Sequence, residues 1–285
     1  MQVGFSTMNN IHLARPDDVA RMVEERGFDS LWLGEHAHIP KESDGTYPGS
    51  ADRKIPEPYK AMGDPFVSLA MAAAATKKLK LGMGVALPLE RDVFSTAKAV
   101  ATLDQLSGGR VLMGVGVGWS QKEFENTAKM PWVKRYSGLR ECVQAMRALW
   151  TQEEATFHGE WYHFDKVWCN PKPLQKPWPP IYVGMAGPTG TAHMVEWGDA
   201  WYPIDIGAKD YGNKLERFRN ALRAAGRDPA KVPVTLVLMG DADLDKMKRY
   251  RDLGIERLVV NVGSQVETNP LKKLDQYAEM IPKLK

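Results

Sequence analysis

Cysteine is scarce in this sequence, with only Cys142 and Cys169 among 285 residues. Neither belongs to a CxxC pair or has histidines at metal-ligand spacing, and Cys142 falls in a segment with helical periodicity. This pattern favours two buried or bystander thiols over a cysteine-bound metal. We therefore predict no metal site.

The sequence also lacks any run of about 18 apolar residues, the length that a membrane-spanning helix needs. Its first residues, MQVGFSTMNN, have the pattern of a strand and its turn instead of a signal peptide. Neither sign of charge is in clear excess, because 38 basic and 35 acidic residues are scattered along the chain. We expect a cytoplasmic protein that binds neither membranes nor nucleic acid.

Apolar residues make up 44% of the chain and charged residues 26%, which is enough for one large core. We therefore predict a single domain over residues 1–285.

The most informative segment is Leu79–Trp119. Two apolar strands that end in glycines, Leu79–Val85 and Arg110–Gly116, flank a helix over Asp92–Leu106, so the strands must be parallel. Glycines at buried strand ends let another group, such as a flat ring, approach the backbone.

The same strand and helix alternation extends over the whole chain. The other predicted strands are Gln2–Ser6, Asp29–Leu33, Pro180–Val183, Ala200–Pro203, Val234–Leu238 and Arg257–Val262. The other predicted helices are Asp17–Arg26, Pro65–Thr76, Thr189–Trp197, Lys209–Ala225, Leu244–Leu253 and Leu271–Ile281. Eight such units in 285 residues indicate an α/β fold, a (β/α)8 TIM barrel, with a doubly wound open sheet as the alternative.

Two connections are too long for plain loops, and they follow strands 2 and 4. They span 34–63 and 118–179, and the second contains a predicted helix over Val133–Trp150 and a short hairpin arm at His158–Phe164. Long connections in compact domains are usually functional, and barrel active sites lie at the carboxyl ends of the strands. Both insertions could therefore roof a substrate pocket.

The glycines at 114, 116 and 118 form GxGxG, but Trp119 and Ser120 follow where a dinucleotide fingerprint needs its third glycine. A nicotinamide site of the Rossmann type is therefore not expected. These glycines suit instead a ring lying over the fourth strand.

Several fragments together resemble the bacterial luciferase-like flavin and deazaflavin oxidoreductases, in particular the branch that uses coenzyme F420. They are WLGEHAHIP (32–40), DPFVSLAMAAAAT (64–76), LKLGMGVALPL (79–89), ATLDQLSGGR (101–110), VGVGW (115–119), PPIYVGMAG (179–187) and GDAWYP (198–203). The resemblance implies a (β/α)8 barrel, a redox cofactor at its carboxyl end and a homodimer. It also implies either hydride transfer to or from a small organic substrate or, with FMN, a monooxygenase reaction.

Glu35 and His36 follow the second strand and are the predicted catalytic residues. Histidine exchanges a proton near neutral pH, and removing a hydride from a carbon that carries a hydroxyl requires a base for the O–H proton. The alternative is a loop histidine that is hydrogen-bonded to Glu35 and takes no part in chemistry. In the resembled family this acid and histidine pair lines the cofactor site.

The resemblance also implies the residues that contact the cofactor ring. Gly84 and Val85 correspond to a non-proline cis peptide that pushes against the ring, with a plain bulge as the alternative. Gly116, Val117 and Gly118 lie at the end of the fourth strand, and Val117 stands where several flavin-using relatives place a basic residue near the flavin phosphate. This departure favours the deazaflavin F420 over FMN.

The loop after the fifth strand, GMAGPTGT, leads into a predicted helix and is the expected phosphate site. Backbone N–H groups at a helix start bind anions, and hydroxyls of Thr189 and Thr191 could add to them. Its predicted cofactor contacts are Gly184, Met185, Ala186, Gly187 and Thr189. Met185 replaces the second of two adjacent glycines in the family pattern, and a turn that only caps the helix is the alternative.

A non-catalytic flavin-binding protein remains a third possible function beside the two enzymes.

Overall fold

A computed structural model of the chain describes residues 1–43, 45–49, 51–185, 187–206, 210–262 and 270–284. Its centre is an eight-stranded parallel sheet in the order β8-β7-β4-β3-β2-β1-β10-β9. Bridges from Trp201 to Val234 and from Ile204 to Val237 join the two end strands, so the sheet nearly closes on itself. The predicted TIM-barrel fold is confirmed.

The eight strands agree with the predicted ones to within two residues at each end. They are β1 (Gln2–Ser6), β2 (Ser30–Leu33), β3 (Lys80–Met83), β4 (Val111–Val115), β7 (Ile181–Val183), β8 (Ala200–Trp201), β9 (Thr235–Leu238) and β10 (Arg257–Asn261). The third strand ends at Met83 instead of Val85, and the Gly84–Val85 peptide bond that follows it is cis. Hydrogen bonding toward β4 continues at Ala86, which pairs with Val115.

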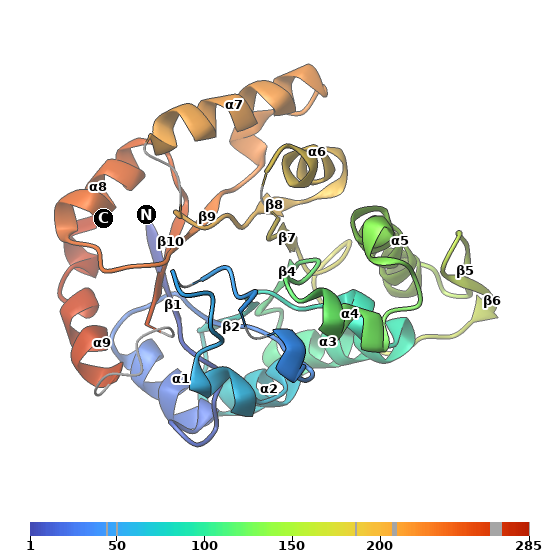
Figure 1. Ribbon diagram of the computed structural model, residues 1–285, viewed down its shortest axis with the longest axis horizontal. Helices are drawn as coiled ribbons and strands as arrows, with labels where there is room; N and C mark the ends of the chain where they lie inside the picture. Colours follow the sequence, from blue (N-terminus) through green and yellow to red (C-terminus); the bar gives the residue numbers. More distant parts are fainter. Residues whose placement is uncertain (44, 50, 186, 207–209, 263–269, 285) are drawn as a thin grey trace.

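Helices surround the strands (Figure 1). They are α1 (Pro16–Glu25), α2 (Pro65–Ala75), α3 (Val93–Ser107), α4 (Gln121–Thr127), α5 (Arg135–Thr151), α6 (Gly187–Trp197), α7 (Tyr211–Ala224), α8 (Leu244–Asp252) and α9 (Pro270–Ala278). Local chemistry sets their ends. In α3, for example, the Asp92 carboxylate accepts the Ser95 N–H at 2.8 Å, and Gly108 ends the helix at a φ of 71°. Among the described residues, no helix is long and apolar enough to span a membrane.

Trp32 is the largest side chain of a buried cluster that also includes Tyr182 and Tyr202. Its ring stacks on Tyr202 at 4.6 Å between centroids and meets the edge of Tyr182 at 5.4 Å. A Cβ added to Gly82 would lie 2.2 Å from the Trp32 ring. Gly82 therefore makes room for the indole ring of Trp32.

Both long connections contain short elements of their own. The first carries two 3-10 turns, η1 (Lys41–Ser43) and η2 (Glu57–Ala61), and the second adds α4, α5 and the antiparallel pair β5 (Ala155–His158) and β6 (His163–Val167). The predicted hairpin is thus confirmed, and its strands are longer than expected. In Figure 1 it stands beyond α5, away from the barrel strands.

Cys142 and Cys169 are both free and buried, as expected.

Candidate active site

The candidate site lies where the parallel strands end. Residues 35–36 follow β2, 84–85 follow β3, 116–118 follow β4 and 184–187 follow β7, and these four strands are neighbours in the sheet. The topology therefore brings most of the predicted site residues to one edge of the barrel, the edge at which barrel enzymes carry their active sites. Ala186 lies outside the described residues.

His36 is held on both ring nitrogens. Its Nδ1 lies 2.7 Å from Oε2 of Glu123, and the indole N–H of Trp119 donates to its Nε2 at 3.0 Å. Because an indole nitrogen can only donate, Nε2 must present a lone pair. We therefore assign the proton to Nδ1, which donates it to Glu123. The imidazole is thus neutral in this arrangement, with its basic nitrogen turned toward Trp119.

The connection over 34–63 forms a roof above this histidine. Tyr59 lies 5.5 Å from the His36 ring and Tyr47 lies 5.3 Å from the Trp119 ring, both between centroids. The two tyrosine hydroxyls are 2.9 Å apart, which ties the roof together. Only 8% of the His36 side chain is exposed. This insertion therefore covers His36, while its role over a substrate pocket stays a prediction.

Glu35 does not bond to His36, so the alternative of a histidine tied to Glu35 is wrong. Its carboxylate forms an ion pair with Arg91 and accepts the Leu87 N–H at 2.7 Å. Burial raises the pKa of Glu35, and the charge of Arg91 counteracts part of that rise. Arg91 also contacts Asp64, the N-cap of α2, at 2.8 Å. Glu35 thus ties the end of β2 to the segment that follows β3.

A second buried carboxyl group, that of Glu90, lies against Glu123. Burial is the largest cause that raises the pKa of Glu90 to about 9, followed by the negative charges of Glu123 and Glu35. Among the described residues, neither oxygen of Glu90 nor Oε1 of Glu123 has a hydrogen-bond partner. Two neighbouring carboxylates out of water cannot both ionise easily, so the pair retains one proton.

The residues after β3, β4 and β7 pack around the Val85 side chain. The Gly84–Val85 peptide bond is cis, as the resemblance implied. A Cβ added to Gly116 would lie 2.6 Å from Val85, and one added to Gly184 would lie 2.5 Å from it. These glycines therefore admit the Val85 side chain, which itself remains half-buried. Val85 thus lies between the ends of β4 and β7.

The next residues of the β4 end do not point outward as a phosphate contact would. Val117 is 9% exposed and belongs to the core between the sheet and its helices. Gly118 has a φ of 72°, and a Cβ there would lie 3.2 Å from Oε1 of Glu90. The backbone at Gly118 thus passes close to the buried carboxyl pair.

The start of α6 presents Gly187 and Thr189 to solvent. Met185 is 4% exposed and packs under the helix, where a Cβ on Gly190 would lie 2.8 Å from it. Only the backbone of Met185 could contact a ligand. The Thr191 hydroxyl donates to the Gly187 carbonyl at 2.9 Å, one turn earlier in its own helix, so it is not directed at a ligand.

Sequence reasoning missed Glu123, Glu90 and Arg91. The sequence around Glu123 indicates a structural role. Ser120 and Glu123 form an SxxE capping pattern, and the Ser120 hydroxyl accepts the Glu123 N–H at 3.2 Å. That pattern predicts a helix start, which is present, but it hides the contact of this carboxylate with His36. Glu90 and Arg91 lie in a short turn with no periodicity.

Comparison with known proteins decides the family. Residues 1–281 match the model of the luciferase-like monooxygenases. The chain belongs to this family. It is a luciferase-like oxidoreductase, and the fold and the strand-end site described above are consistent with that membership.

Among luciferase-like relatives, an uncharacterized protein of Mycobacterium tuberculosis is 38% identical over 251 residues, which are 86% of each chain. An F420-dependent glucose-6-phosphate dehydrogenase of Kineococcus radiotolerans is 30% identical over 232 residues, or 80% of this chain and 64% of the relative. A solved F420-dependent secondary alcohol dehydrogenase superposes with a TM-score of 0.77 at 22% identity, over 100% of this chain and 99% of the other.

Proposed function

We propose that this protein is an F420-dependent oxidoreductase that transfers a hydride between the deazaflavin and a small alcohol or carbonyl compound. The observation that carries the proposal is the His36 imidazole at the end of β2, which Glu123 and Trp119 hold with a lone pair on Nε2. Membership of the luciferase-like family and the F420-dependent relative at 30% identity support the choice of cofactor.

The residues present fit such a cofactor. The cis peptide at Gly84–Val85 and the glycines at 116 and 184 would lie under the ring, and the exposed start of α6 at Gly187 and Thr189 would hold an anionic tail. Val117 is apolar and buried, so it supplies no charge for a flavin phosphate. The bound deazaflavin would supply the hydride chemistry, while the protein orients it and handles protons.

His36 would accept the substrate hydroxyl proton at Nε2, or return it in the reverse direction. The substrate oxygen takes the place that the Trp119 indole N–H occupies at 3.0 Å in this structure. Glu123 keeps the proton of the ring on Nδ1 and stabilises the imidazolium that forms, as a carboxylate does for the histidine of a catalytic triad. Trp119 and Tyr59 exclude water from this histidine.

Glu90 would leave Glu123 as the charged member of this buried carboxyl pair. Because the pKa of Glu90 is raised to about 9, its carboxyl group carries the proton of the pair at neutral pH. Glu35 and Arg91 would not contact the substrate. Their ion pair would hold the backbone after β2, and with it His36, in place. We propose Glu35 as a positioning residue, and His36 as the catalytic base.

The first test is titration of the purified protein with F420 and, separately, with FMN, followed by the change in fluorescence of each cofactor. We expect saturable binding of F420 and much weaker binding of FMN. Tight binding of FMN without binding of F420 would overturn the deazaflavin proposal and favour a flavin monooxygenase. Binding of F420 without turnover of any alcohol or carbonyl compound in a broad panel would favour a non-catalytic carrier.

The second test is His36→Asn, assayed with the substrate that the panel identifies. Loss of a positioned general base lowers kcat by about 10²- to 10⁴-fold, while binding of F420 should be retained. The matched control is His38→Asn, because His38 lies two residues away and contacts Asn126 at 2.9 Å. Equal activity of the two variants would remove His36 from the mechanism.

A further inference from the structure

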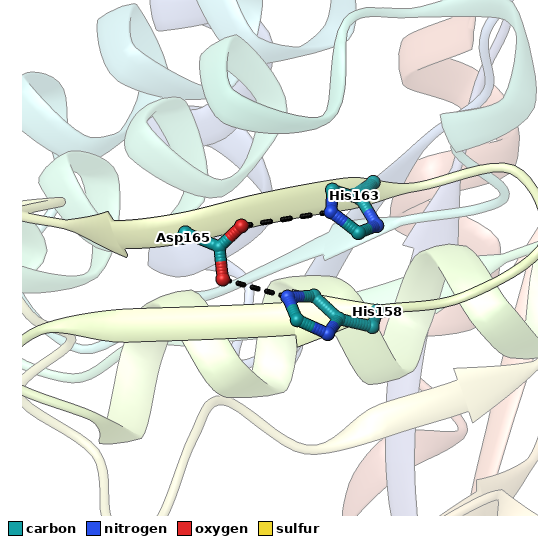
Figure 2. A group of neighbouring side chains, drawn as sticks. All are labelled: His158, His163 and Asp165. Atoms are coloured by element: carbon teal, nitrogen blue, oxygen red, sulfur yellow. Dashed lines mark hydrogen bonds and ion pairs between the residues drawn. The ribbon is translucent and has the colours of Figure 1, made fainter.

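The hairpin of β5 and β6 carries three metal-binding side chains on one face, as Figure 2 shows. His158 and His163 are directly opposite each other across the two strands, with their rings parallel at 4.2 Å between centroids. Asp165 lies two residues after His163 and so points to the same face of β6. The strand register therefore brings together ligands that are up to seven residues apart.

The three side chains already converge on one point. Asp165 Oδ1 lies 2.6 Å from Nε2 of His158, and Oδ2 lies 3.5 Å from Nε2 of His163. One ligand atom from each residue lies within 4.8 Å of the others. A tetrahedral zinc ion with bonds of about 2.0–2.1 Å requires ligand atoms roughly 3.3 Å apart. Small side-chain rotations would therefore suffice to enclose an ion.

The two imidazole nitrogens and one carboxylate favour one class of metal ion. Imidazole nitrogens suit zinc and the neighbouring late transition metals, whereas magnesium and calcium prefer sites made of oxygen atoms. Asp165 adds a carboxylate, which late transition metals also accept, on the same face as the two imidazoles. Two neutral imidazoles and one carboxylate present a single negative charge to a dication.

The hairpin is held against α5 and α3, so an ion that binds to it would have little backbone to order. Oε1 of Glu141 in α5 accepts the backbone N–H groups of Trp161 at 2.6 Å and Tyr162 at 2.9 Å. On the other face, Phe164 contacts Phe94 of α3 at 5.1 Å between ring centroids. The turn between the two histidines is thus fixed on the body of the protein.

We propose that His158, His163 and Asp165 bind one divalent transition-metal ion of the zinc class. The three side chains are 56%, 64% and 59% exposed, so water completes the coordination of the ion. The ion clamps β5 to β6 and replaces the hydrogen bond between His158 and Asp165. It takes no part in the proposed redox reaction, because the hairpin stands apart from the barrel strands in Figure 1. The proposal differs from the sequence-based prediction of no metal, which considered only the cysteines.

The test is calorimetric titration of untagged, chelator-treated protein with ZnCl2 near pH 7.5, and separately with MgCl2. We expect one equivalent of Zn²⁺ and no saturable binding of Mg²⁺. His158→Ala and Asp165→Asn should each weaken Zn²⁺ binding at least about tenfold. His12→Ala removes an exposed histidine elsewhere and should leave binding unchanged. The buried thiols of Cys142 and Cys169 should not compete.

Thermal unfolding gives an independent readout. Zn²⁺ at a hundred times its Kd favours the folded state by about a hundredfold, so the Tm of the wild type should rise and that of His158→Ala should not. Unchanged Zn²⁺ stoichiometry and affinity in a folded His158→Ala, His163→Ala double variant would overturn the proposal. So would the absence of binding by the wild type.

Discussion

The indole N–H of Trp119 donates to Nε2 of His36 across 3.0 Å, although the two residues are 83 positions apart in the chain. Because the indole has no lone pair to accept a proton from the ring, this contact selects one tautomer of the imidazole. Glu123 accepts the other ring N–H at 2.7 Å. The imidazole is therefore oriented without a ligand, and in the proposed mechanism the substrate oxygen replaces the Trp119 contact.

Glu123→Gln should disturb this orientation while keeping the shape of the side chain. An amide can donate to Nδ1, so the ring proton is no longer confined there, and we expect kcat to fall by about 10²- to 10⁴-fold. Nitrogen-15 NMR of the histidine rings should show His36 with its proton on Nδ1 in the wild type and a mixture in the variant. Glu125→Gln, on the exposed side of the same helix, should change neither readout. An unaltered tautomer in Glu123→Gln would refute the orienting role.

Glu90 should make the stability of the protein fall as the pH rises. Its pKa is raised from 4.5 to about 9 in the folded state, so the folded protein retains a proton that the unfolded chain loses. Its contribution is fully present below pH 4.5 and is lost as the pH rises toward 9, with a slope of up to about 1.4 kcal/mol per pH unit. Glu90→Gln removes the ionisation.

The measurement is the free energy of unfolding of the wild type and of Glu90→Gln, by urea titration at several pH values. The advantage of the variant should be absent at pH 4 and grow steadily up to pH 9. Glu125→Gln serves again as the control, since its exposed carboxylate should give no such trend. A constant difference between wild type and Glu90→Gln at all pH values would contradict the buried carboxyl pair.

Gly82→Ala should destabilise the fold by about 1–3 kcal/mol, because the new methyl group overlaps the Trp32 ring at 2.2 Å. Gly240→Ala is the matched control, with no atom within 4 Å of the added Cβ, and should lie within about 0.5 kcal/mol of the wild type. Denaturant unfolding measures both. The effect of Gly82→Ala should shrink in a Trp32→Leu background, and equal effects in both backgrounds would rule out the proposed overlap.

Thr189→Glu should weaken F420 binding about tenfold at low salt, because it places a negative charge at the exposed start of α6 where the anionic tail is proposed to bind. The loss should diminish as salt is added. An acidic residue in the first turn of a helix is favourable, so the fold should not suffer. Thr189→Ser keeps the hydroxyl and serves as the control. Unchanged affinity of Thr189→Glu at low salt would place the tail elsewhere.

The order of strands and helices could be predicted because it depends on local patterns. Buried parallel strands show as short apolar runs, and caps such as Asp92 and Gly108 act within one turn of the chain. The position of His36 just after β2 follows from the same patterns. The role of Gly82 could not be predicted, since a glycine in a strand looks the same whether a cofactor or Trp32 occupies the space beside it.

The alternation of apolar runs and amphipathic segments is enough to specify a barrel and to place His36 at its carboxyl end, because each element is encoded over a few neighbouring residues. The partners of His36 were decided only in three dimensions. Trp119 and Glu123 come from the insertion after β4, Tyr59 comes from the one after β2, and Glu90 comes from the turn after β3. Their meeting depends on how long connections pack over the strand ends, and no local periodicity encodes that packing.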